Sequence, residues 1–203
     1  MRKKNYFFIF STIWFLVFCG ETQDKIAQEF MPTAKGEIGS IMLVMDQQQW
    51  DHDLGIQLRG ILREPMPGLP QDEPFFHLNR VSPKKLNSTL KSSANMIFVV
   101  TLDSKTSESN VLKGFLTSES LRMIKLDTSL YMSIRKDEFA KGQIILYLFG
   151  NTEKDLSQKL KKNKERIQSL FEKRVRDRTV RKLFKSHEKS LEQVVQEAHS
   201  FQI

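Results

Sequence analysis

The chain has 203 residues, of which 39% are hydrophobic and 28% are charged, and a formal net charge of +8. This composition is ordinary for a protein with one globular core. The single cysteine, Cys19, excludes an internal disulfide and a thiolate metal cluster, so the fold must be stabilised by packing.

The first eighteen residues have the layout of an export signal. Basic residues 2–4 precede an apolar run from Tyr6 to Phe18, which is shorter than the roughly 20 residues that a membrane-spanning helix needs. The run ends in a sequence that resembles a bacterial lipobox, in which the cysteine is acylated and the chain is cleaved just before it. Phe18 stands where a lipobox has a small residue. We predict a signal peptide over 1–18 and fatty acylation (palmitate) at Cys19; an uncleaved anchor and an accidental cysteine are the alternatives.

Two further regions are expected after the signal peptide. Residues 19–35 are predicted to be a lipidated N-terminus and a flexible tether, because charged and polar residues mix there without periodicity. Residues 36–203 are predicted to form a single α+β domain. The expected location is the cell envelope, where two or three acyl chains would anchor the protein stably to the inner or the outer membrane.

Positive charge is concentrated in one segment. Residues 153–189 contain fourteen Lys or Arg against six Asp or Glu, and loss of the three basic residues of the leader leaves the mature chain at +5. A basic stripe on an exported protein suits phosphate-bearing lipid headgroups or an acidic polymer better than nucleic acid, and we expect no nucleic-acid partner. The solvated face of a long helix is the simpler explanation.

In chain order, the first predicted element is a strand over 38–45, a nearly continuous apolar run typical of a strand covered on both faces. Asp46 then stands in a capping position. Apolar residues recur at spacings of three and four from Gln47 to Glu64, which predicts an amphipathic helix that follows the strand directly.

The middle of the chain predicts further strands. Residues 65–74 contain four prolines and are therefore a loop. A strand is expected over 75–81, a helix over 84–93 and a central, wholly apolar strand over 96–102. Residues 103–110 are rich in Ser and Thr and are expected to be a loop or hairpin tip.

The C-terminal half predicts a strand pair and a long helix. The paired strands are expected over 129–135 and 143–149, with a turn between them. Thr152 begins a basic helical segment that keeps one apolar face to residue 198 and should break near 176–182, because an unbroken helix would outgrow the domain. The predicted fold is α+β, with a mixed sheet of about five strands, helices on at least one face and a long basic C-terminal helix.

The sequence contains no metal-site or cofactor signature. The four histidines, His52, His77, His187 and His199, lack the shared spacing of a zinc helix. No phosphate-binding Gly-rich loop, nucleophile elbow or dinucleotide fingerprint is present. We therefore predict neither a metal nor a cofactor.

Carboxylates and aromatic residues gather around the proline-rich loop. The carboxylates are Asp46, Asp51, Asp53, Asp72 and Glu73, which would serve as acid and base if they converge, or as helix caps and turn residues if they do not. The aromatic residues Trp50, Phe75 and Phe76 would floor a binding groove at the carboxyl end of a strand, or else belong to the core.

One string of residues carries a resemblance to a known family. It is PxPGLPQDEPFF, residues 65–76, supported by residues 32–36 and by Trp50. The string resembles a family of predicted Bacteroidota lipoproteins known only as a domain of unknown function. The resemblance covers about residues 32–203, implies an envelope location and brings no catalytic residue. Members of that family continue past the position of Ile203, which implies that the chain is C-terminally incomplete.

The sequence thus predicts an envelope lipoprotein that is a non-enzymatic binding or structural module. Its expected contact surface is Trp50, Asp72, Glu73, Phe75 and Phe76, and its expected partner is an envelope protein or an acidic polymer. One alternative is a hydrolase, which needs Asp46, Asp72 and Glu73 to converge around a cleft. A second alternative is that the basic helix binds lipid headgroups or an acidic polymer.

Overall fold

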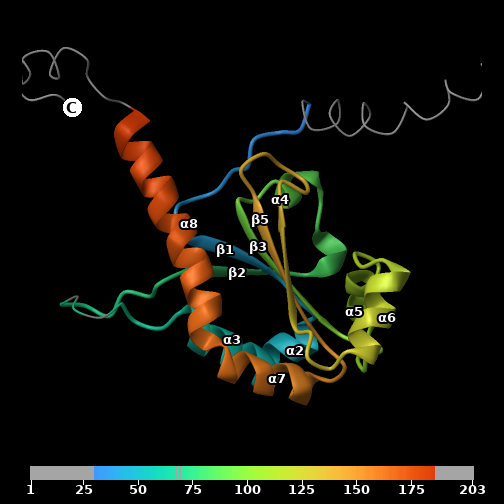
Figure 1. Cartoon of the computed structure of the whole chain (residues 1–203). Coiled ribbons are helices and arrows are strands. Elements are labelled where there is room, and N and C mark those ends of the chain that lie inside the picture. The colour runs from blue at the N-terminus through green and yellow to red at the C-terminus, as the bar shows by residue number, and fades with distance from the viewer. Residues whose placement is uncertain (1–29, 67, 69, 186–203) are drawn as a thin grey trace, which may run out of the picture.

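The computed structural model describes residues 30–66, 68 and 70–185, and Cys19 and residues 186–203 lie outside this part of the chain. A five-stranded mixed sheet forms its centre (Figure 1). The four parallel strands are neighbours, and the antiparallel strand pairs at one side. In spatial order the strands are β2 (His77–Val81), β1 (Ser40–Val44), β3 (Asn95–Thr101), β5 (Ile144–Gly150) and β4 (Met132–Lys136). The predicted α+β class with about five strands is confirmed.

The two longest strands are buried along their whole length. Every residue of β3 and β5 is buried, and the two strands pair in register from Asn95 and Ile144 to Thr101 and Gly150. Parallel strands covered by helices on both faces lack polar alternation, which is why the sequence predicted both as apolar runs. The outer strands β2 and β4 are only partly buried.

Helices cover both faces of the sheet. Alternate residues of β3 divide between two cores, with Ile97 and Val99 on one face and Phe98 and Val100 on the other. The first core is closed by α3 (Asp53–Leu62), α7 (Glu153–Lys162) and α8 (Lys164–Lys185). The second is closed by α5 (Ser107–Lys113) and α6 (Ser118–Leu126).

The helix predicted after the first strand is two helices. Asp46 caps α2 (Gln47–Asp51) as predicted, accepting hydrogen bonds from two backbone N–H groups of its first turn. His52 then takes an extended backbone conformation and α3 begins. A Cβ at Gly55 would lie 2.0 Å from the Trp50 carbonyl oxygen, so only glycine fits this sharp turn.

Three other helix predictions need correction. The helix expected over 84–93 is a 3-10 turn η1 (Pro83–Lys85) followed by the single turn α4 (Ser88–Lys91). The loop expected over 103–110 contains the start of α5, and α6 was not predicted. Both begin at a threonine whose hydroxyl accepts a backbone N–H three residues later: Thr106 for α5 and Thr117 for α6.

The break in the long basic helix lies at Asn163 and not at 176–182. The Asn163 side chain donates to the Lys159 carbonyl at 2.8 Å, which closes α7, and the chain then turns into α8. The turn lets Leu160 on α7 and Ile167 on α8 both pack into the first core. Residues 176–182 continue α8 without interruption.

The two ends of the strands form two distinct edges of the sheet, because four of the five strands are parallel. At the amino edge, where they begin, Ala34 N–H donates to the Lys141 carbonyl and Ala94 N–H donates to the Lys35 carbonyl. The last residues of the expected tether therefore bond to the domain, while residues 19–29 lie outside the described part. The carboxyl edge, where these strands end, carries α2 and the start of α7 (Figure 1).

Across the described residues, the search for a helix long and apolar enough to cross a membrane found none.

Candidate functional site

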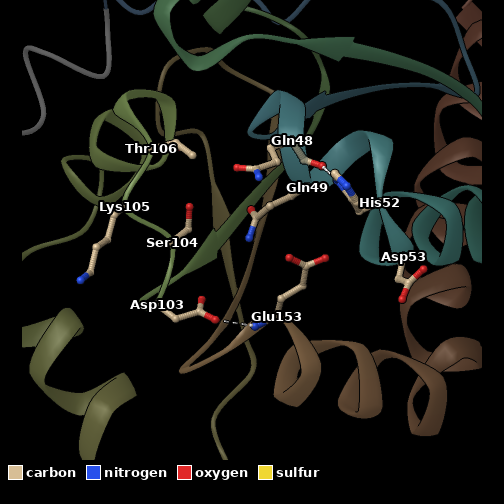
Figure 2. Close-up of a pocket in the computed structure, with 9 residues that line it drawn as sticks. All are labelled: Gln48, Gln49, His52, Asp53, Asp103, Ser104, Lys105, Thr106 and Glu153. Carbon is tan, nitrogen blue, oxygen red and sulfur yellow. Dashed lines mark hydrogen bonds between the residues drawn. The ribbon is translucent and has the colours of Figure 1, made fainter.

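A crevice opens at the carboxyl edge between β1 and β3. From β1 the chain passes through α2 and α3 to β2, whereas from β3 it passes over the opposite face through α5 and α6. Ligands of open α/β sheets bind where successive connections leave in opposite directions. The crevice has a volume of about 440 Å³, within the usual range for small-molecule sites. Its lining residues (Figure 2) are Gln48, Gln49, His52, Asp53, Asp103, Ser104, Lys105, Thr106 and Glu153.

Asp46 holds the two walls of this crevice together. One of its carboxylate oxygens caps α2, and the other accepts the hydroxyl hydrogen of Thr106, the residue that caps α5. Asp46 is buried and does not line the crevice. Its role is therefore to fix the loop after β1 against the loop after β3.

Gln49 presents an unpartnered oxygen at the base of the crevice. Its side chain is 4% exposed, and its Nε2 donates to Thr101 Oγ1 at 2.7 Å. Its Oε1 has no hydrogen-bond partner among the described residues. A buried carbonyl without a donor costs about 1–3 kcal/mol, so this oxygen favours a ligand that supplies one.

Acceptors outnumber donors around that oxygen. Asp53, Asp103 and Glu153 contribute three carboxylates against one ammonium, that of Lys105, which gives the lining a formal charge of −2. Asp103 also accepts the backbone N–H of Glu153 at 3.3 Å, so it caps the start of α7 (dashed line in Figure 2). The side of the crevice formed by β3 and α7 is thus acidic and tied to regular structure.

His52 adds one more acceptor. Its Nδ1 lies within hydrogen-bond distance of the Gln48 carbonyl, which accepts only, so in the neutral ring Nδ1 carries the hydrogen. The Nε2 lone pair then remains available. In the described part of the chain, no group of three or more His, Cys, Asp or Glu is arranged to hold a metal ion.

A second polar network supports the crevice from behind. Arg80, on β2, donates to the Met45 carbonyl and to Glu108 of α5, and Glu108 accepts from the Gln47 N–H at 2.7 Å and from the Ser82 hydroxyl. Burial acts to raise the pKa of Glu108, but these hydrogen bonds and the Arg80 charge outweigh it and the pKa is lowered. The carboxylate therefore stays ionised and joins β2, α2 and α5.

Comparison with protein families gives one match. The family described as domain of unknown function (DUF8532) matches residues 34–184, about three quarters of the chain. The chain belongs to the DUF8532 family. Neither the curated proteins nor the solved structures that were compared with it gave a match.

The DUF8532 match covers the whole sheet and both of its edges. Of the carboxylates predicted from the sequence, Asp53 lines the crevice, but the predicted contact surface of Trp50, Asp72, Glu73, Phe75 and Phe76 does not. Phe76 is buried in the first core, 6.0 Å from the ring of Phe171. Trp50 and Phe75 are partly buried against the same core. The Arg59 guanidinium lies 4.2 Å from the centre of the Trp50 ring.

Asp72 and Glu73 are exposed on the proline-rich loop of this DUF8532 protein. The loop leads into β2 at the amino edge, where His77 pairs with Ser40. Asp46 follows β1 at the carboxyl edge, and a strand of five residues spans about 17 Å. The convergence of Asp46, Asp72 and Glu73 that a hydrolase would need is therefore not formed, and binding by the loop stays a prediction.

The sequence did contain a signal for the DUF8532 crevice. Asp103 follows directly on the apolar run 96–102, just as Asp46 and Gln47 follow the run 38–45. Polar residues at the ends of two adjacent parallel strands must lie side by side. The sequence alone does not show that β1 and β3 are neighbours, so residues 103–106 have only the pattern of a loop.

Proposed function

We propose that this DUF8532 protein is a cell-envelope lipoprotein, anchored through Cys19, whose domain binds a small organic cation without transforming it. The expected ligand carries primary ammonium groups. The observation that carries the proposal is the buried, unpartnered Oε1 of Gln49 at the base of an acidic crevice.

The anchor is supported by the sequence. A basic start, an apolar run of signal-peptide length and a solitary cysteine at its end occur in the order that export and acylation require. Acyl chains on Cys19 would hold the protein at a membrane with no protein segment inside the bilayer.

The choice of a cation follows from hydrogen-bond inventory and charge. Gln49 donates one hydrogen of its amide nitrogen to Thr101, while its free oxygen and the carboxylates of Asp53 and Glu153 can only accept. An ammonium group supplies several donors and the opposite charge. Phosphates and other anions would meet repulsion, and the lining residues include no aromatic platform for a sugar ring.

The hydrogen bonds of the crevice residues favour binding over catalysis, because the side chains of Asp103 and His52 bond to the backbone and not to each other. Asp103 is hydrogen-bonded to the backbone at the start of α7, and His52 to the backbone of α2. Nucleophilic catalysis needs a nucleophile hydrogen-bonded to a base. The described contacts place no such bond between Ser104 and His52, so these groups form a rigid receptor.

Isothermal titration calorimetry on the purified full chain in detergent tests the proposal. Spermidine and putrescine should bind, while glucose and inorganic phosphate should not. Gln49→Leu removes the free acceptor and Glu153→Gln removes one charge, and each should weaken amine binding by about ten- to hundredfold. Glu153 lies at a helix start on the surface, so its variant tests the site even if Gln49→Leu lowers stability.

The matched control is Glu73→Gln, which removes a carboxylate at the amino edge and should leave the affinity unchanged. Amine binding that Glu73→Gln weakens as much as Glu153→Gln would place the ligand elsewhere. Failure of both amines to bind at millimolar concentration would refute the cation receptor.

A further inference from the structure

The last three turns of α8 carry apolar side chains that the domain does not cover. Val180, Leu183 and Phe184 are 45%, 68% and 67% exposed. Spacings of three and four residues place them on one face of the helix. Ile167 and Phe171, earlier in the same helix, are fully buried. Figure 1 shows the reason, because this end of α8 projects beyond the sheet.

The same stretch is strongly basic. Residues 173–184 contain six cationic side chains and a single carboxylate, that of Asp177. In the described part of the chain, no salt bridge neutralises any of the six. The pKa of Arg178 is lowered by burial and by the neighbouring charges of Arg174 and Arg181, which shows that these charges repel one another.

These residues lie at the amino edge, where the described chain enters the domain. Arg178 donates to the Gly36 carbonyl at 2.9 Å, and Arg174 donates to the Gly142 carbonyl. The first described residues and the end of α8 both lie at the top of Figure 1. Gly36 follows Cys19 by 17 positions, a reach of at most about 60 Å. A lipid on Cys19 would therefore tether the domain to the bilayer from this edge.

We propose that residues 173–184 of α8 form a second membrane contact, which binds the surface of an anionic phospholipid bilayer. The cations would meet lipid phosphates while Leu183 and Phe184 enter the boundary between headgroups and acyl chains. The long stems of Arg and Lys allow their charges to stay at the headgroups while the apolar side chains enter the bilayer surface. The contact goes beyond the proposed receptor function. It does not require the Cys19 lipid, which would only raise the local concentration of α8 at the bilayer.

Vesicle co-sedimentation tests the contact without the lipid. The protein is the mature chain, residues 19–203, carrying Cys19→Ser so that it cannot be acylated. Vesicles of phosphatidylglycerol mixed with phosphatidylcholine should bind it, and vesicles of phosphatidylcholine alone should not. Binding should fall as salt is raised, because surface charges are screened.

Two variants divide the contact into its parts. Arg176→Glu with Arg181→Glu should lower partitioning by about tenfold or more, since each basic side chain near an anionic surface contributes a factor of about five. Leu183→Ser with Phe184→Ser should lower it even at low salt. The matched control is Lys161→Glu with Lys162→Glu, the same change of charge on exposed residues of α7, which should bind as the parent does.

Three results would overturn the contact. One is equal binding to neutral and anionic vesicles, and another is equal loss of binding in the α7 control. The third is a dimer in analytical ultracentrifugation that Leu183→Ser with Phe184→Ser dissociates, together with no vesicle binding, because a second copy would then cover the apolar face. None of these outcomes affects amine binding, so the two proposals fail separately.

Discussion

At the scale of single residues, Glu108 connects α5 to α2 and to the end of β2 at the carboxyl edge. It accepts a hydrogen bond from the Gln47 N–H, 61 residues away in sequence, and from Arg80 and Ser82 on and after β2. Its side chain is 19% exposed and its pKa is lowered by these donors against the opposing effect of burial. Its charge therefore contributes to folding stability.

We predict that Glu108→Gln lowers the free energy of unfolding by about 1–3 kcal/mol at pH 7, the range for hydrogen bonds to a charged group. Because the folded-state pKa is lowered, the carboxylate stabilises the fold above the unfolded-state pKa of about 4.3, and this stabilisation is lost as the pH falls through the folded-state value. The difference between parent and variant should therefore shrink below about pH 4. Urea unfolding at a series of pH values measures it.

The control is Glu119→Gln on α6, which also removes a glutamate paired with an arginine. Glu119 and Arg122 are both more than half exposed, and such pairs contribute at most about 1 kcal/mol. The change in unfolding free energy should be small. A loss for Glu108→Gln that is equal at pH 7 and at pH 3 would contradict the assignment to the charge.

Individual residues were predictable where their partners are local. Asp46 was identified as a helix cap because that role depends on the next three residues. Its bond to Thr106, 60 residues away, was not predictable, because it depends on β1 and β3 being neighbours. Trp50, Phe75 and Phe76 show the same limit, because the sequence does not distinguish an aromatic residue that lines a groove from one that belongs to the core.

At the scale of elements, strongly apolar segments were predicted correctly, whereas short polar helices were not. β3 and β5 were predicted because a buried parallel strand reads as an unbroken apolar run. α5 and α6 were missed because each is short and mostly polar, with a single buried apolar side chain, Leu112 on α5 and Ile124 on α6. Such helices form on the sheet and have little intrinsic signal.

The helix break illustrates the same point for α7 and α8. Weak apolar signal at 176–182 suggested the break, but those residues extend beyond the sheet, where nothing requires the helix to end. The break at Asn163 has a tertiary cause, because the turn there allows apolar side chains of both helices to pack on one face of the sheet.

We predict that Phe171→Ala lowers the free energy of unfolding by about 3–5 kcal/mol, because it leaves a cavity where the ring packs edge-on against Phe76. Phe184→Ala on the same helix should change it by less than about 0.5 kcal/mol, because that ring is mostly exposed. Urea unfolding of the two variants side by side measures both. Equal effects would show that Phe184 is covered by other parts of the protein in solution.

At the scale of the whole molecule, the candidate site illustrates why fold precedes function. The crevice combines residues 48–53, 103–106 and 153, which come from three separate connections. Each segment alone has no feature that marks a binding site. The sequence predicted the strands that precede them, but strand order is a property of the complete sheet, and it decides which turns become neighbours.

The proposed anchor makes a prediction at the same scale. The parent chain expressed in a bacterial host should sediment with the membranes and be released by detergent but not by high salt, because acyl chains and not surface charges hold it. Cys19→Ser should lack any acyl mass and should keep its leader, because cleavage at a lipobox follows acylation of the cysteine. Mass spectrometry of the parent should show a mass increase corresponding to acyl chains at Cys19.

The control for the anchor is Arg176→Glu with Arg181→Glu on the acylated chain, which should stay in the detergent-released fraction. A parent chain that carries an unmodified thiol and an intact leader would contradict the anchor.

The parallel arrangement of β2, β1, β3 and β5 gives the domain a direction. Chain entry and the end of α8 lie at one edge, and the acidic crevice opens at the other. In the anchored protein that we propose, the domain would stand on its amino edge and present the mouth of the receptor to the aqueous compartment, about one sheet height from the lipid. Solutes would reach it by free diffusion, and another protein would be able to dock over a loaded receptor while the anchor stays in place.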